Sequence, residues 1–265
     1  MLGHDKFEFE WISLYKFQCR RMARFIHGRV IFAGDSAHQV SPFGARGANS
    51  GLEDAENLAW KLDRVLRRLS PESLLESYHI ERSAAADENI RESTRSTDFM
   101  APVTKQEARL RQAVLSLAED TEFGKRMVNG GRLSVPSVYD TPLSSGDRDD
   151  WRGGPRPGAS MLDAPLTEQG GGATYLTDVF IRQGTRFTLL EFGNGTAVDV
   201  PEGVGTIRVG GEGGLVDARG LAGKRYDAEP GTAYLLRPDG YVAARFRNAA
   251  RPALDAALAR ASGLN

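Results

Sequence analysis

Residues 29–69 constrain the fold of this 265-residue chain more than any other segment. They begin with an apolar run at residues 30–33, pass through a loop that carries glycines and a proline, and continue with helical spacing. The continuous apolar run predicts a strand that is buried on both faces. From Gly51 onward, apolar residues recur every three or four positions, which predicts a helix with a buried apolar face.

The turn between this strand and this helix carries groups that suit a nucleotide-like ligand. Asp35, at the predicted end of the strand, can accept hydrogen bonds from a ribose or a polyol. Gly34 lets a ligand approach the backbone closely. The helix opens near residues 47–50, where unpaired N–H groups and the helix dipole favour a negative charge. A Gly–Asp pair alone is more often a simple turn than part of a ligand site. The longer motif around it therefore decides between these two interpretations.

The longer motif resembles the second FAD-binding motif of FAD-dependent aromatic-ring hydroxylases, the flavoprotein monooxygenases similar to phenol hydroxylase and 3-(3-hydroxyphenyl)propionate hydroxylase. It reads G-D-x-A-H, then Pro42, then G-x-x-G-x-N-x-G-x-x-D-A-x-N-L-x-W-K-L. The resemblance implies that Asp35 binds the ribityl chain of FAD and that Pro42 lies beside the isoalloxazine ring. The implied cofactor-binding residues are Gly34, Asp35, Pro42, Gly44, Arg46, Gly47, Ala48 and Asn49.

One position in this motif departs from the family pattern. The family commonly has Gly-Gln-Gly where this chain has Ala45-Arg46-Gly47. We expect the Arg46 side chain either to point to solvent or to contact flavin or substrate.

The sequence lacks the other half of an FAD site, because no G-x-G-x-x-G follows a strand. That motif supplies the pyrophosphate contacts in dinucleotide folds. The resemblance therefore implies the C-terminal half of an enzyme that hydroxylates an aromatic small molecule with FAD, NAD(P)H and O₂. We expect this chain alone to be inactive. Two alternatives stay open: one subunit of a split flavoenzyme, and a non-catalytic association module. Each makes a homodimer or a complementing chain a plausible partner.

Composition limits the partners and the compartment. A net charge of −1 gives no field that would attract nucleic acid or an anionic membrane. The single cysteine, Cys19, excludes an internal disulfide and favours a reducing compartment. The four histidines lack zinc spacing, and no run of about 20 apolar residues could span a membrane. We therefore predict a cytoplasmic protein without metal ligands, and we assign no catalytic residue from the sequence.

The predicted architecture is α/β, with two domains. Residues 1–135 are expected to form part of a Rossmann-like, glutathione-reductase-type FAD-binding domain with long helices, including a half-buried strand over residues 7–14 and a third helix within residues 104–128. Residues 136–154 form a linker rich in proline, glycine and charge. Short apolar runs at residues 179–181, 187–190, 207–209, 234–236 and 241–243 then predict an α/β domain over residues 155–265.

This second domain resembles the thioredoxin-like C-terminal domain of the same hydroxylases, on residues 187–190 and 236–243. Pro238-Asp239-Gly240 predicts a hairpin turn, and Pro252 predicts the start of a final helix. Because the domain contains no cysteine, thiol–disulfide chemistry is excluded there, and a structural or interfacial role is expected.

Three further expectations concern single residues. His38 is expected to be a hydrogen-bonded structural residue rather than a catalyst. Trp11 and Phe43 could line an aromatic pocket, although packing is the commoner use of such residues. Asp54 lies in the first turns of its predicted helix, and the helix dipole alone explains an acid there.

Overall fold

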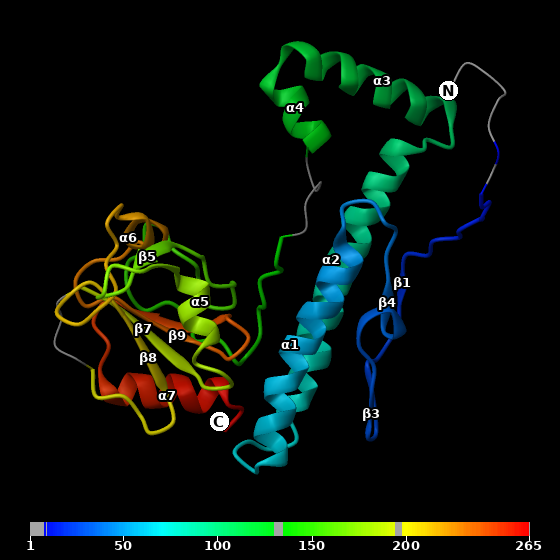
Figure 1. Cartoon of the computed structure of the whole chain (residues 1–265). Coiled ribbons are helices and arrows are strands. Elements are labelled where there is room, and N and C mark those ends of the chain that lie inside the picture. Colours follow the sequence, from blue (N-terminus) through cyan, green and yellow to red (C-terminus); the bar gives the residue numbers. More distant parts are fainter. Residues whose placement is uncertain (1–7, 9, 130–134, 194–197, 265) are drawn as a thin grey trace.

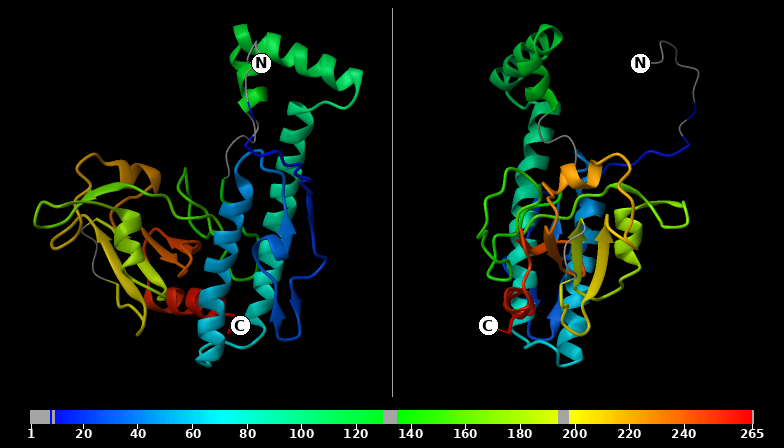
Figure 2. Two further views of the ribbon diagram at one scale, coloured as in Figure 1. Left: turned by 45° about the vertical axis from the view of Figure 1, so that its right-hand side comes forward. Right: turned by 90° about the vertical axis from the view of Figure 1, so that its left-hand side faces the viewer.

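Two long antiparallel helices form the centre of the molecule (Figure 1). The computed structural model describes residues 8, 10–129, 135–193 and 198–264. Helix α1 (Arg46–Leu66) and helix α2 (Leu74–Met100) run side by side and make a helical hairpin. Small N-terminal strands lie along one side of this hairpin, and a separate sheet lies on the other side, as the turned views of Figure 2 also show. Among the described residues, no helix is long and apolar enough to cross a membrane.

The N-terminal strands form two short ribbons rather than a buried sheet. Strand β1 (Arg20–Arg21) pairs with β4 (His38–Gln39), and β2 (Ile26–His27) pairs with β3 (Val30–Ile31), both antiparallel. The prediction of a doubly buried strand at residues 30–33 is wrong for this structure. Strand β3 has one partner among the described residues, which leaves Val30 56% exposed. The turn that follows is the 3₁₀ helix η1 (Gly34–Ser36).

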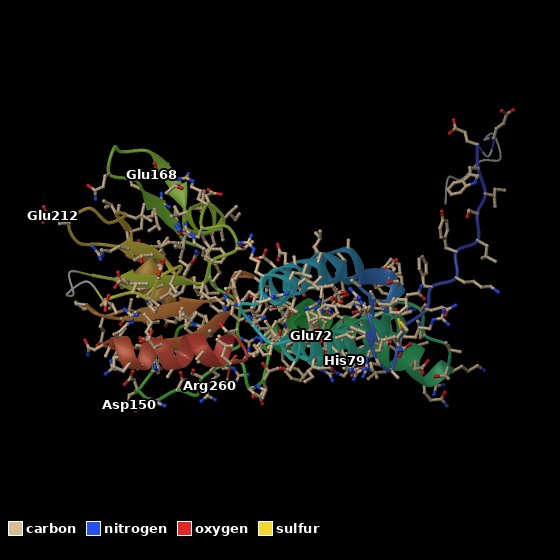
Figure 3. The ribbon with its side chains drawn as sticks, turned by 90° about the horizontal axis from the view of Figure 1, so that it is seen from below. Glu72, His79, Asp150, Glu168, Glu212 and Arg260 are labelled. Carbon is tan, nitrogen blue, oxygen red and sulfur yellow. The ribbon has the colours of Figure 1, made fainter. Side chains whose placement is uncertain are left out.

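The segment before β1 extends away from the body of the molecule, with its side chains in open space (Figure 3). Trp11 and Leu14 are 73% and 86% exposed, and the described part of residues 8–19 forms no strand. The predicted strand at residues 7–14 is therefore absent from the described residues, because no neighbouring strand pairs with them. Phe7 and Phe9 themselves lie outside the described residues.

Beyond α2 the chain turns back on itself. The predicted third helix is two helices, α3 (Lys105–Asp120) and α4 (Glu122–Asn129). A capping box opens α3: the Thr104 hydroxyl accepts from the Glu107 N–H, while the Glu107 carboxylate accepts from the Thr104 N–H. Thr121 has an extended backbone, which ends α3 and starts a new helix at a sharp angle.

The C-terminal unit (residues 155–264) contains a four-stranded mixed sheet in the order β10-β9-β7-β8. Strand β7 pairs with β8 in parallel and with β9 in antiparallel fashion, and β9 pairs with β10 through the predicted hairpin turn. Its elements are β5 (Pro165–Thr167), β6 (Ala173–Tyr175), α5 (Leu176–Ile181), β7 (Thr188–Phe192), β8 (Gly205–Val209), α6 (Leu221–Arg225), β9 (Ala233–Leu236), β10 (Val242–Phe246) and α7 (Arg251–Ala261). Four of the five apolar runs are strands as predicted, whereas residues 179–181 lie in α5.

Alternating side chains give this sheet an apolar core on each face. Leu190 packs on the face covered by α5 and by the aromatic ring of Tyr226. Leu189 packs on the opposite face, against α7 and against Trp60 of α1. Leu74, at the start of α2, belongs to this second core as well. The sheet is therefore joined to the foot of the helical hairpin by a continuous apolar contact.

Candidate functional site

The Gly34–Asp35 turn lies directly against helix α1. Gly34 has a left-handed backbone, with φ of +58°. A Cβ atom on Gly51 would lie 3.5 Å from the Gly34 Cα, at ordinary van der Waals distance, so η1 packs directly on α1. The Asp35 side chain is exposed, and no hydrogen bond to it is seen among the described residues. The carboxylate is thus available to a ligand at the edge of α1.

Hydrogen bonds to α2 hold the loop that leads into α1. The buried Ser41 hydroxyl lies 2.6 Å from the Ser93 hydroxyl and 2.7 Å from the Thr97 hydroxyl, both on α2. This anchor leaves the following residues, Pro42 and Phe43, on the surface. Ser41 therefore holds the loop on α2, while the side chains of Pro42 and Phe43 lie at the surface.

The first turn of α1 is open to an acceptor. Ala45 precedes it in a left-handed conformation, no side chain caps it, and no acidic residue lies in it. The Asn49 side chain donates back to the Ala45 carbonyl rather than capping an N–H group. Because no side chain of the described residues caps this helix of 21 residues, its first turn presents backbone N–H groups and the positive end of its dipole to a ligand.

The structure brings together most of the residues that the sequence motif indicates, but it turns one side chain away. Gly34 and Asp35 pack beside the start of α1, where Gly47 is partly buried and Ala48 and Asn49 are exposed. Arg46 is buried, and its Nη1 donates to the Asn89 amide oxygen on α2 at 2.9 Å. Of the two alternatives expected for Arg46, the one in which it points to solvent is wrong, because its guanidinium is held by α2; contact with flavin or substrate stays a prediction.

The buried carboxylate of Asp54 holds the Gly34–Asp35 turn in place. This carboxylate is 0% exposed and accepts from the Gly34 N–H at 2.8 Å and from Arg82 Nε at 2.5 Å. It also lies 2.6 Å from His38 Nε2. The prediction of His38 as a structural hydrogen-bonded residue is confirmed. The explanation of Asp54 by the helix dipole alone is wrong, since the carboxylate joins three separate elements.

Arg82 uses its whole guanidinium group to hold α1. Besides Asp54, it donates through Nη1 to the Glu53 carboxylate at 3.0 Å and through Nη2 to the carbonyl and hydroxyl of Ser50. Its remaining Nη1 hydrogen goes to the Tyr139 hydroxyl at 2.6 Å. The five N–H donors of arginine are all engaged, which a lysine could not reproduce.

A second ionic cluster, the Glu81 cluster, joins the helical hairpin to the C-terminal unit. It consists of Asn57, Lys61, Glu81, Arg237 and Asp239. Arg237 donates to both Glu81 oxygens, at 2.7 and 3.0 Å, and Lys61 Nζ donates to Glu81 Oε2 at 2.7 Å. Trp60 Nε1 donates to Asp239 at 2.9 Å.

Burial and charge set the protonation of these groups. Burial alone would raise the pKa of Asp54, but the His38 hydrogen bond and the Arg82 charge outweigh it and hold that pKa below its usual value. Burial would also raise the pKa of Glu81, and the charges of Arg237 and Lys61 lower it well below the usual range. For Lys61 burial dominates over the attraction of Glu81 and lowers the pKa to about 8.

A cavity of about 800 Å³ opens beside the loop, between the end of α2 and the α3–α4 elbow. Its walls include Phe43, Gly44, Phe99 and Val114. Of the two aromatic residues for which a pocket was the alternative to packing, Phe43 lines this cavity and Trp11 does not. The cavity therefore joins an apolar space to the loop that carries the motif residues.

Sequence reasoning misassigned the role of Asp54 and missed the roles of Glu81, Arg82, Tyr139 and Arg237. The available signal was a polar stripe on α1: Arg46, Ser50, Asp54, Asn57 and Lys61 follow helical spacing, and all are buried. The apolar stripe that was expected to face the core is partly exposed instead, with Leu52 at 66% and Leu66 at 79%. The prediction of an apolar buried face is wrong, because the most buried side chains of α1 are polar ones that pair with Glu81 and Arg82 of α2, whereas apolar residues such as Leu58 and Val65 are only partly buried.

Two parts of the chain match known protein families. The FAD binding domain family matches residues 4–93, and the family described as the C-terminal part of aromatic-ring hydroxylases matches residues 154–264. Over these two parts the chain is similar to FAD-dependent aromatic-ring hydroxylases. Among solved structures, it superposes on the flavin-dependent monooxygenase PieE in complex with FAD and substrate with a TM-score of 0.69 and 27% identity. It superposes on aklavinone-11 hydroxylase in complex with FAD and aklavinone with a TM-score of 0.67 and 26% identity.

The relatives of this chain carry different names. Dialkyldecalin synthase of Streptomyces rugosporus is 31% identical over 94% of this chain and 44% of its own length. A flavin-dependent monooxygenase of Mycobacteroides abscessus is 32% identical over 89% of this chain and 41% of its own length. The two solved structures are covered by 50% and 46%. The chain thus spans about half the length of these relatives, and one shared fold carries different named reactions.

Proposed function

We propose that this chain forms the ribityl and pyrimidine side of an FAD site, and that the complete site hydroxylates an aromatic small molecule with NAD(P)H and O₂. The observation that carries the proposal is the exposed Asp35 carboxylate beside the uncapped start of α1. An acid suits the hydroxyl groups of a polyol, and a bare helix N-terminus suits the electron-rich edge of a flavin. FAD, when bound, would supply the redox chemistry.

The motif residues divide this task. Asp35 accepts hydrogen bonds from the ribityl hydroxyls, and Gly34 leaves room for the ligand beside the backbone. The N–H groups of Gly47, Ala48 and Asn49 would bind the pyrimidine edge of the flavin, and Pro42 and Gly44 would lie beside its ring. Arg46 contributes through its backbone N–H, since its side chain is directed to Asn89. Asp54 and Arg82 hold the turn without touching the cofactor.

The cavity next to Phe43 is proposed to hold the aromatic part of the substrate. Its volume of about 800 Å³ falls in the range of small-molecule sites. Arg111 lines it with a buried Nε that has no hydrogen-bond partner among the described residues. A substrate oxygen, such as a phenolic or carbonyl oxygen, would satisfy that donor.

The finer description of the fold also belongs to the proposal. We assign residues 1–135 to part of a Rossmann-like FAD-binding domain, 136–154 to a linker and 155–265 to a thioredoxin-like domain. Two parallel strands followed by an antiparallel hairpin, in the order β10-β9-β7-β8, support the thioredoxin-like assignment. A cytoplasmic location fits the single cysteine.

A second candidate function is one subunit of a split flavoenzyme. It is favoured by the exposed apolar side chains at the N-terminal end, where Trp11, Ile12, Leu14, Tyr15 and Phe17 are each more than half exposed. Contiguous exposed apolar side chains of this kind favour association with another protein surface.

Titration of the ¹⁵N-labelled chain with FAD tests the site. We expect weak binding, because the sequence has no G-x-G-x-x-G, with amide shifts centred on Gly34, Asp35, Gly47 and Ala48. Asp35→Asn should weaken binding about tenfold through the loss of a charged hydrogen-bond acceptor. Asp140→Asn changes an exposed acid elsewhere and should not alter it. Shifts centred elsewhere, or none with millimolar FAD, would refute the site. Tight stoichiometric binding would refute the expected weakness.

A further inference from the structure

Between the C-terminal unit and the Gly34–Asp35 turn lies an unbroken chain of buried contacts. Tyr241, just before β10, stacks on Tyr139 with ring centroids 4.2 Å apart and planes at 18°. The Tyr139 hydroxyl accepts from Arg82, Arg82 donates to Asp54, and Asp54 accepts from the Gly34 N–H. Each of the side chains in this chain is at most 6% exposed.

The C-terminal unit also holds Tyr139 through the backbone. The Tyr139 N–H donates to the Gly158 carbonyl at 2.8 Å, and the Gly158 N–H donates to the Val242 carbonyl on β10 at 2.8 Å. Gly158 has φ of +86°, and a Cβ atom there would lie 2.0 Å from the Tyr139 carbonyl oxygen. Only glycine permits this close contact, so the place of Tyr139 is set by β10.

Arg82 transmits this placement because its guanidinium group is planar and fully engaged. Its Nη1 bond to Tyr139 and its Nε bond to Asp54 belong to one rigid plane. Without the tyrosine hydroxyl, a charged donor would be buried without a partner, which proteins avoid at substantial cost. The plane would turn to satisfy that donor, and the Asp54 carboxylate would lose its alignment with Gly34 N–H and His38.

We propose that Tyr139 is a positioning residue through which the C-terminal unit sets the geometry of the Gly34–His38 turn. The consequence for flavin rests on the proposed function, since that turn carries Asp35. The C-terminal unit then has a role in the cofactor site although it supplies no group that touches FAD. The hydroxyl group, rather than the aromatic ring, is the part of Tyr139 that acts on Arg82.

Tyr139→Phe in the full chain tests this inference, because it removes the hydroxyl and keeps the ring stacked on Tyr241. Hydrogen exchange of the Gly34 amide should become about tenfold faster, and the His38 ring nitrogen resonances should shift. The Leu190 and Leu235 amides in the sheet report global unfolding and should exchange at most slightly faster. Tyr226→Phe is the matched control: it removes a hydroxyl bonded to the Leu162 backbone, and Gly34 should not respond.

The outcomes separate the two proposals. If Gly34 and His38 are unchanged in Tyr139→Phe, or if all amides accelerate equally, the positioning role is overturned, whatever FAD does. If they change while the unaltered chain binds no FAD, the positioning role stands and the flavin assignment fails. If the unaltered chain binds FAD, Tyr139→Phe should weaken that binding several-fold and Tyr226→Phe should not.

Discussion

Loss of the Glu81 charge should destabilise this chain more than most single substitutions, because three buried side chains, Asn57, Lys61 and Arg237, donate to that carboxylate. Lys61 and Arg237 place two positive charges against Glu81 and Asp239, and all four side chains are at most 1% exposed. In Glu81→Gln, two buried cations would face a single carboxylate. Removal of one member of a buried ion pair costs about 3–5 kcal/mol. For a chain of this size that corresponds to a fall in Tm of about 10 °C.

Thermal and urea unfolding, read by circular dichroism, measure this cost. Glu122→Gln makes the same chemical change at an exposed pair with Lys125 and should lower the free energy of unfolding by less than about 0.5 kcal/mol. In the double variant Glu81→Gln/Lys61→Met the buried charges balance again, so it should be more stable than Glu81→Gln. A loss below about 1 kcal/mol in Glu81→Gln, or additive losses in the double variant, would refute the reasoning.

Three further predictions concern pH and association. The lowered pKa of Asp54 contributes stability that is present above its usual value of 3.8 and is lost as pH falls further, so Asp54→Asn should show a shallower acid decline of Tm than the unaltered chain. Lys61 has a pKa lowered from 10.5 to about 8, so the unaltered chain should gain stability relative to Lys61→Met between pH 8 and 10.5; a flat difference would contradict this. The exposed apolar N-terminal segment should cause association in sedimentation at high concentration, and Trp11→Ser with Leu14→Ser should reduce it.

The C-terminal unit was largely predictable because local rules and packing agree there. Short apolar runs bounded by glycine and proline became four strands, and the turn at Pro238 and Gly240 joins the last two. The final helix buries Leu254 and Ala257 on the sheet, as its spacing predicts. Residues 179–181 lie in helix α5 and not in a strand. Three apolar residues fit both the helical and the strand repeat, and the residues before them complete the helix.

The N-terminal strands were less predictable, because a strand is defined by its neighbours. The apolar run at residues 30–33 is typical of a strand buried on both faces, yet β3 pairs only with β2. No local pattern states how many partners a strand has. The turn, the loop and the start of α1 adjoin one another in the structure, and the contact of the motif residues with FAD stays a prediction.

The helical hairpin shows why a correct element can still be assigned the wrong face. Helix α1 carries an apolar stripe and a polar stripe with the same period, and periodicity cannot tell which one faces inward. The usual rule buries the apolar stripe, but the rule fails where the partner helix offers matched charges. On α2, the neighbours Glu81 and Arg82 point to different partners: Glu81 holds Arg237 of the C-terminal unit, and Arg82 holds Asp54 behind the Gly34 turn. A hydrophobic α1–α2 contact would stabilise the hairpin, but it would supply no directed bond to the turn. The buried charges fix distances and angles at the turn, and this geometric control explains why a polar stripe occupies the face that burial alone would assign to leucine.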